Sequence, residues 1–79
     1  MQNMQWQIQK IIDTANALVR TGSTGASTGE WIAAAFVLDD QGYLPAGYTM
    51  VDAWDRLGDE WQGYVRLVLC DYRHLISPF

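Results

Sequence analysis

Hydrophobic residues recur along this chain with helical spacing, and no stretch alternates between apolar and polar positions as a half-buried strand does. Over residues 2–20, apolar positions at about 100° per residue fall on one stripe. Gln9, Lys10 and Asp13 lie off that stripe. The pattern therefore predicts an amphipathic helix with a buried face of Met4, Ile8, Ile11, Ile12, Ala15, Leu18 and Val19.

A second helix is predicted over residues 28–38, after a glycine-rich loop at residues 21–29. Ser27 and Glu30 have the spacing of a capping box, in which each side chain accepts a hydrogen bond from the other residue's backbone N–H. Residues 31–38 are apolar on nearly every side, as in a helix that neighbours cover all round. We expect this helix at the centre of the domain.

Two further helices follow, over residues 50–57 and 59–76. Gly42, Pro45 and Gly47 make a continuation of the second helix unfavourable. Thr49 suits the N-cap of the third helix, and Gly58 suits the position just past its end.

The fourth helix begins at Asp59, where Gln62 repeats the capping spacing, and ends before Pro78. Together these elements predict a single all-α domain over residues 1–79, with about four helices packed irregularly or orthogonally around the central apolar helix. The apolar stripe of the fourth helix comprises Trp61, Tyr64, Val65, Val68, Leu69, Tyr72, Leu75 and Ile76.

Composition places the chain among small folded proteins. With 79 residues, 49% of them hydrophobic, it is long enough for one core and too apolar for a disordered chain. Its one cysteine, Cys70, excludes an intrachain disulfide. The first residues lack the charged and apolar regions of a signal peptide, and the longest apolar run is too short to cross a bilayer. We expect a cytoplasmic protein that does not bind membranes.

The formal net charge is −4, which argues against direct binding of nucleic-acid phosphates. Between residues 39 and 60 there are six acids and one base, Arg56. We interpret the acids as a patch that binds a basic protein surface. A simpler reading makes Asp52, Asp59 and Glu60 helix-start residues and the others solvated surface. The proposed patch consists of Asp39, Asp40, Asp52, Asp55, Asp59 and Glu60.

Three aromatic residues are candidates for the same interface. Trp6 lies nearly opposite the apolar stripe of its helix, and tryptophan is enriched at interface hot spots. Alternatively, Trp6 packs beneath Phe79 or against the glycine-rich loop. Tyr43 and Tyr48 lie in the loop beside the acids, where they would add aromatic contacts to a partner-binding surface.

No catalytic, metal or cofactor site is expected. Cys70 and His74 are four residues apart, so an α-helix would place a thiol beside an imidazole on one face. Cys70, Asp71 and His74 are too few for a closed zinc site, which takes four ligands. The glycine-rich loop lacks the lysine and preceding strand of a phosphate-binding loop. We therefore expect Cys70 to fill apolar space, His74 to be a surface residue near a helix end, and the glycine-rich loop to be a flexible connector.

The segments Gly29-Glu-Trp-Ile-Ala-Ala-Ala-Phe-Val-Leu-Asp-Asp, Tyr43-Leu-Pro and Val51-Asp-Ala-Trp-Asp-Arg-Leu57 resemble uncharacterised proteins of mobile genetic elements. The overall profile is similar to anti-CRISPR proteins from phages, which are short, acidic and non-catalytic. That resemblance implies binding to a CRISPR effector complex, in the host cytoplasm, and a block on DNA recognition or nuclease recruitment.

A non-enzymatic, protein-binding inhibitor is accordingly the expected function. The alternative is a self-associating regulatory or assembly module of the antitoxin type, in which exposed aromatic residues form a homodimer seam. A small enzyme using Cys70 and His74 ranks last.

Overall fold

The computed structural model describes residues 5–76, and this range is helical with no strand. It contains three α-helices and three shorter turns. Met4, Pro78 and Phe79, which the predictions used, lie outside the described residues. The elements are α1 (Trp6–Thr21), α2 (Thr28–Val37), the 3-10 turn η1 (Gln41–Tyr43), α3 (Met50–Leu67), the π-helical turn η2 (Val68–Tyr72) and the 3-10 turn η3 (Arg73–Leu75).

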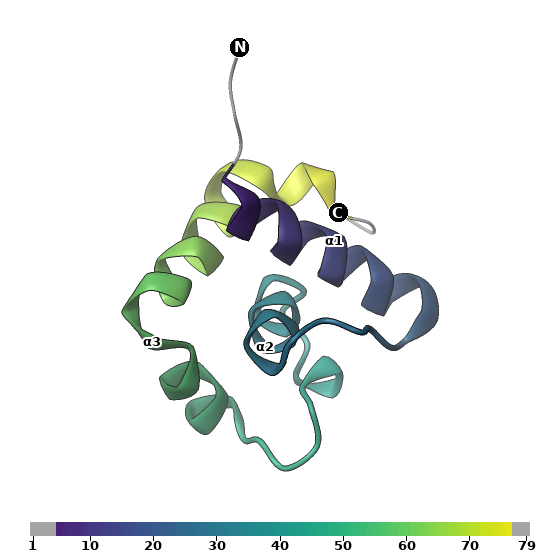
Figure 1. Ribbon diagram of the computed structural model, residues 1–79, viewed down its shortest axis with the longest axis vertical. Coiled ribbons are helices and arrows are strands. Elements are labelled where there is room, and N and C mark those ends of the chain that lie inside the picture. The colour runs from purple at the N-terminus through teal and green to yellow at the C-terminus, as the bar shows by residue number, and fades with distance from the viewer. Residues whose placement is uncertain (1–4, 77–79) are drawn as a thin grey trace.

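The apolar helix α2 lies at the centre of the molecule. Figure 1 shows it almost end-on, with α1 and α3 on two sides of it. Ile32, Ala33 and Ala34 are each 0% exposed, and they belong to a core shared by all three helices. Because alanine side chains are short, α1 and α3 can approach the α2 backbone closely. The position expected for residues 28–38 therefore agrees with the structure.

Helix α1 covers α2 with the face that its spacing predicts. The positions Ile8, Ile11 and Leu18 are at most 2% exposed. Gly22 caps the C-terminal end of the helix. Its φ of 80° is the left-handed conformation that glycine adopts at low cost, and its N–H donates to the Leu18 carbonyl.

The capping box at the start of α2 is also present. The Glu30 N–H donates to the Ser27 hydroxyl at 3.3 Å, and the Ser27 N–H donates to the Glu30 carboxylate at 3.1 Å. Both donors belong to the first turn, where backbone N–H groups have no intrahelical acceptor. These two bonds fix the residue at which α2 begins.

The predicted third and fourth helices form one element, α3, which bends at Gly58. Gly58 has a φ of 76° and a ψ of 168°, outside the helical region. The predicted capping interaction between Asp59 and Gln62 was wrong. The Gln62 side-chain amide instead donates to the Trp54 carbonyl across the bend, at 2.8 Å. That bond links the segment after the bend to the segment before it, so the two halves remain connected.

Gly58 and Gly63 make a matched test of this bend. An added Cβ would meet no atom within 4 Å at either position, so only the backbone conformation distinguishes them. We expect Gly58→Ala to destabilise the domain by about 1–2 kcal/mol, because a side chain disfavours positive φ. We expect Gly63→Ala, inside α3, to stabilise it by about 0.5–1 kcal/mol. Urea denaturation of both variants measures the difference, and effects of the same sign would contradict the assigned bend.

The predicted α-helix over residues 59–76 is wrong beyond Leu67. The backbone continues as the π-helical turn η2 and then as η3. A π turn inserts extra backbone per turn and so rotates the residues that follow it relative to an α-helix. Val68 and Ile76 are buried as expected, but Leu75 is 43% exposed. The register change explains why Leu75 leaves the predicted stripe.

Candidate protein-binding surfaces

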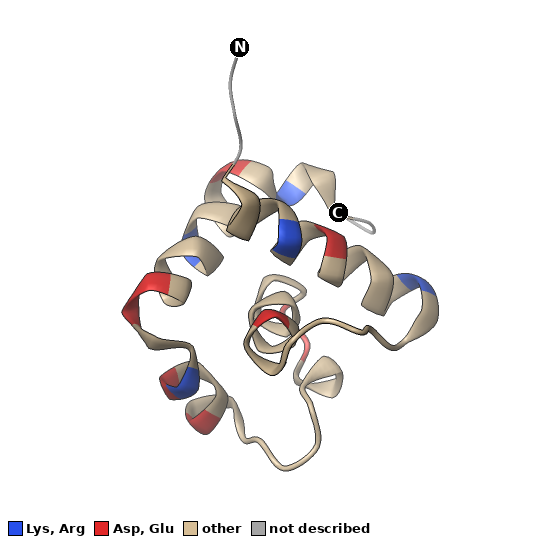
Figure 2. Ribbon diagram, in the orientation of Figure 1, with Lys and Arg blue, Asp and Glu red and all other residues tan. Residues whose placement is uncertain are grey.

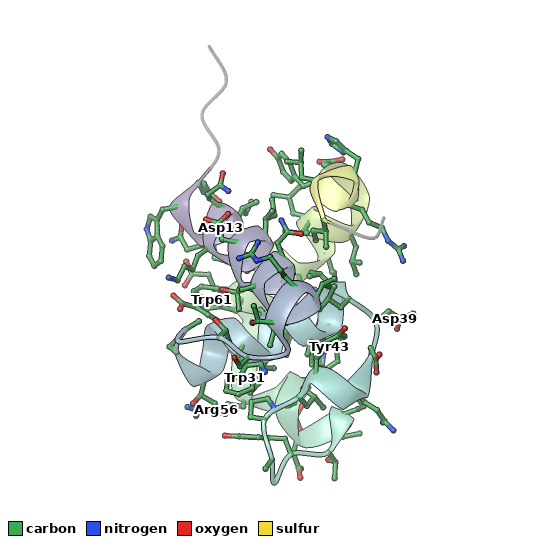
Figure 3. The ribbon with its side chains drawn as sticks, turned by 90° about the vertical axis from the view of Figure 1, so that its right-hand side faces the viewer. Asp13, Trp31, Asp39, Tyr43, Arg56 and Trp61 are labelled. Atoms are coloured by element: carbon green, nitrogen blue, oxygen red, sulfur yellow. The ribbon has the colours of Figure 1, made fainter. Side chains whose placement is uncertain are left out.

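All six acids of the predicted patch are exposed, but they fall into two groups. Asp39 and Asp40 directly follow α2, whereas the other four lie on α3, which runs along the outer edge of the molecule in Figure 2. Figure 3 shows Asp39 on the opposite side of the molecule from Arg56 and Trp61, which belong to α3. We call Asp52, Asp55, Asp59 and Glu60 the α3 acids.

Asp39 and Asp40 have local structural roles. Asp39 has a φ of 56°, a left-handed conformation that aspartate and asparagine tolerate better than most residues. The Asp40 carboxylate accepts a hydrogen bond from the Gly42 N–H at 2.8 Å and caps η1. These two residues shape the turn after α2.

The α3 acids are placed by the helix. Asp52 lies in the first turn, where its N–H donates to the Thr49 hydroxyl at 3.1 Å and its charge suits the helix dipole. The Tyr64 hydroxyl donates to the Glu60 carboxylate at 2.9 Å. This hydrogen bond is the main cause that raises the pKa of Tyr64 above its ordinary value. Asp55 and Asp59 lie on the two sides of the bend at Gly58.

Trp6 is exposed, with 64% of its surface open to solvent. Its ring lies against Trp61 of α3, with centroids 6.4 Å apart in an edge-to-face arrangement. Trp61 in turn meets Tyr64 in a similar arrangement, with centroids 5.5 Å apart. We call Trp6, Trp61 and Tyr64 the aromatic row. The sequence pattern predicted that Trp61 and Tyr64 lie on a buried stripe. In the structure both side chains are half-buried and pack against the core. The pattern therefore gave no indication that they also form part of the surface.

Tyr43 and Tyr48 are half-buried and pack against the core. The Trp31 indole N–H donates to the Tyr43 carbonyl, which ties η1 to α2 (Figure 3). Both tyrosines therefore anchor the segment between α2 and α3, and their side chains are less exposed to solvent than that of Trp6.

Cys70 and His74 are both exposed but do not share an α-helical face. Cys70 belongs to η2 and His74 to η3, where the spacing of four residues no longer corresponds to one turn. The expectation that Cys70 fills apolar space was wrong. Within residues 5–76, no three His, Cys, Asp or Glu side chains are grouped to hold a metal ion.

A shallow groove lies between the start of α2 and the bend of α3, with a volume of about 240 Å³. Leu57 and Trp61 supply its apolar wall, and Arg56 and Glu30 place one charge of each sign on it. Ser27 and Gly29 complete the lining, and the Ser27 hydroxyl and the Glu30 carboxylate are both engaged in the capping box. The groove is open and mixed in character, which favours a contact surface over an enclosed ligand site.

Comparisons of the chain with protein-family models, with curated proteins and with solved structures found no match. Over the described residues, every helix is too short or too polar to cross a membrane.

Proposed function

We propose that this protein is a non-enzymatic inhibitor of the anti-CRISPR type, which binds a basic surface of a CRISPR effector complex in the host cytoplasm. One observation carries the proposal: four exposed acids follow α3 along the outer edge of the domain (Figure 2). The small, acidic and helical character of the chain supports the same class.

Electrostatics provides the mechanism of inhibition. An effector complex holds target DNA through lysine and arginine side chains, because nucleic-acid binding depends on phosphate contacts. The α3 acids would occupy such side chains and so compete with DNA for them. Charge matching of this kind raises the rate of encounter and disfavours partners with negative surfaces.

A DNA-binding assay tests the proposal. A purified, guide-loaded effector complex is mixed with the full chain, and target-DNA binding is followed by electrophoretic mobility shift. We expect DNA binding to fall as the chain is added, and the chain to co-elute with the effector in gel filtration. Unchanged DNA binding and nuclease activity, with no co-elution for effectors of several types, would overturn the proposal.

Stoichiometry separates a binder from an enzyme. We expect the active fraction of effector to fall in proportion to added chain and to reach zero near one equivalent, because each inhibited complex retains a bound chain. The double variant Cys70→Ser, His74→Ala should inhibit within about twofold of the wild type. Complete inhibition by a small fraction of an equivalent, or loss of inhibition in this variant, would indicate catalysis.

Self-association is the second candidate, and the exposure of Trp6, at 64%, favours it. Exposed apolar side chains on a small domain suit a dimer seam. Light scattering over a range of concentrations distinguishes the two candidates. A mass that stays at one chain argues against the dimer, and a mass that doubles with concentration supports it.

A further inference from the structure

The aromatic row joins an open indole to a carboxylate. Trp6 keeps 64% of its surface exposed even though Trp61 lies against it. Trp61 contacts Tyr64, and the Tyr64 hydroxyl holds the Glu60 carboxylate at 2.9 Å. The row therefore runs from an accessible ring on α1 to a fixed negative charge on α3.

The charges beside the row are unequal. On α3, Asp59 and Glu60 directly precede Trp61, and both are exposed. On α1, Lys10 follows Trp6 by one helical turn and is also exposed. The groove that Trp61 lines adds one further charge of each sign. The surroundings of the row thus combine three acids with two bases, and they favour a cationic group over an anionic or a wholly apolar one, which would leave the carboxylates desolvated.

We infer that the aromatic row is an anchor for an arginine side chain of the basic partner, an inference that rests on the proposed function. The guanidinium group is planar, so it stacks on an indole face and still directs N–H donors at a neighbouring carboxylate. A lysine ammonium has no such plane to stack. The molecule contains the same pairing internally, because the guanidinium carbon of Arg66 lies 5.4 Å from the centre of the Trp54 ring.

Short peptides of one charge test the anchor. The full chain is titrated with heptaarginine and, separately, with heptalysine, and binding is followed by calorimetry and by the NMR signal of the Trp6 indole N–H. We expect heptaarginine to bind about two- to five-fold more tightly than heptalysine, because the guanidinium group adds planar stacking and paired N–H donors to a cation–π contact that both side chains make. The Trp6 indole signal should shift with heptaarginine.

Three variants locate the effect. Trp6→Ala should remove the preference for arginine, and Lys10→Gln should tighten heptaarginine binding because it removes the nearby like charge. Val51→Ala is the matched control, since Val51 is 70% exposed but lies at the start of α3 and outside the row. We expect it to leave both affinities unchanged.

The outcomes separate this inference from the proposed function. Equal binding of the two peptides, or heptaarginine binding unaffected by Trp6→Ala, would overturn the anchor, as would a Trp6-dependent doubling of mass in light scattering. If Trp6→Ala also leaves effector inhibition intact, the proposed function stands without the anchor. A selective response of Trp6 to heptaarginine in a chain that inhibits no effector would support the anchor and overturn the proposed function.

Discussion

Ala34→Glu is expected to unfold the domain. Ala34 is 0% exposed and lies in the middle of α2, among core residues of all three α-helices. A glutamate there would bury a carboxyl group and also need space that the close packing does not contain. Burying an unpaired polar group costs about 2–7 kcal/mol, while the whole stability of a domain of this size is about 4–12 kcal/mol. Overpacking adds about 1–3 kcal/mol to that cost.

Circular dichroism and one-dimensional NMR measure this result directly. We expect Ala34→Glu to lose most of its helical signal and its dispersed methyl resonances at 25 °C. The control is Ala46→Glu, which makes the same chemical change at an exposed position in the loop before α3. It should remain folded. A cooperatively folded Ala34→Glu variant with a normal melting transition would mean that α2 is not the centre of the core.

Neutralising two of the α3 acids is expected to weaken partner binding more than neutralising the acids after α2. The α3 variant carries both Asp55→Asn and Asp59→Asn, and the other variant carries both Asp39→Asn and Asp40→Asn. The two double variants change the net charge by the same amount. Each ion pair at an interface rim contributes about 0.2–1 kcal/mol, so we expect a loss of about 2- to 30-fold for the α3 variant. The other variant should bind within about twofold of the wild type.

Asparagine is the suitable replacement because it preserves the local structure. At Asp39 it accommodates the positive φ, and at Asp40 its carbonyl oxygen can accept the hydrogen bond from the Gly42 N–H. The effector's dissociation constant, measured by calorimetry at several salt concentrations, gives the comparison. We expect a shallower salt dependence for the α3 variant alone. Equal losses in both variants would mean that only overall charge matters, with no specific surface.

Local signals in the sequence predicted much of the fold. The stripe of α1 and the apolar character of α2 specify buried faces through spacing alone, and the Ser27–Glu30 pair marks the start of α2. Each of these depends on residues within a few turns of one another. Gly58 was correctly recognised as a break, but the bond from Gln62 to the Trp54 carbonyl joins the two sides into α3.

Other features depend on contacts that no local pattern specifies. The π-helical turn after Leu67 has no residue signature, so the exposure of Leu75 did not follow from the stripe. Closeness in sequence suggested one acidic patch, but the turn after α2 and the course of α3 separate its members. The contact between Trp6 and Trp61 joins α1 to α3, and residues this far apart in sequence meet only once the helices pack.

Hydrogen–deuterium exchange of the chain, alone and with a saturating effector complex, tests most directly whether the partner docks on α3. The bend at Gly58 interrupts the helix, so we expect amides of residues 58–62 to exchange readily in the free protein. We expect binding to slow exchange in this segment and to leave residues 39–44 unchanged. Protection confined to residues 39–44, or to the loop between α1 and α2, would contradict it.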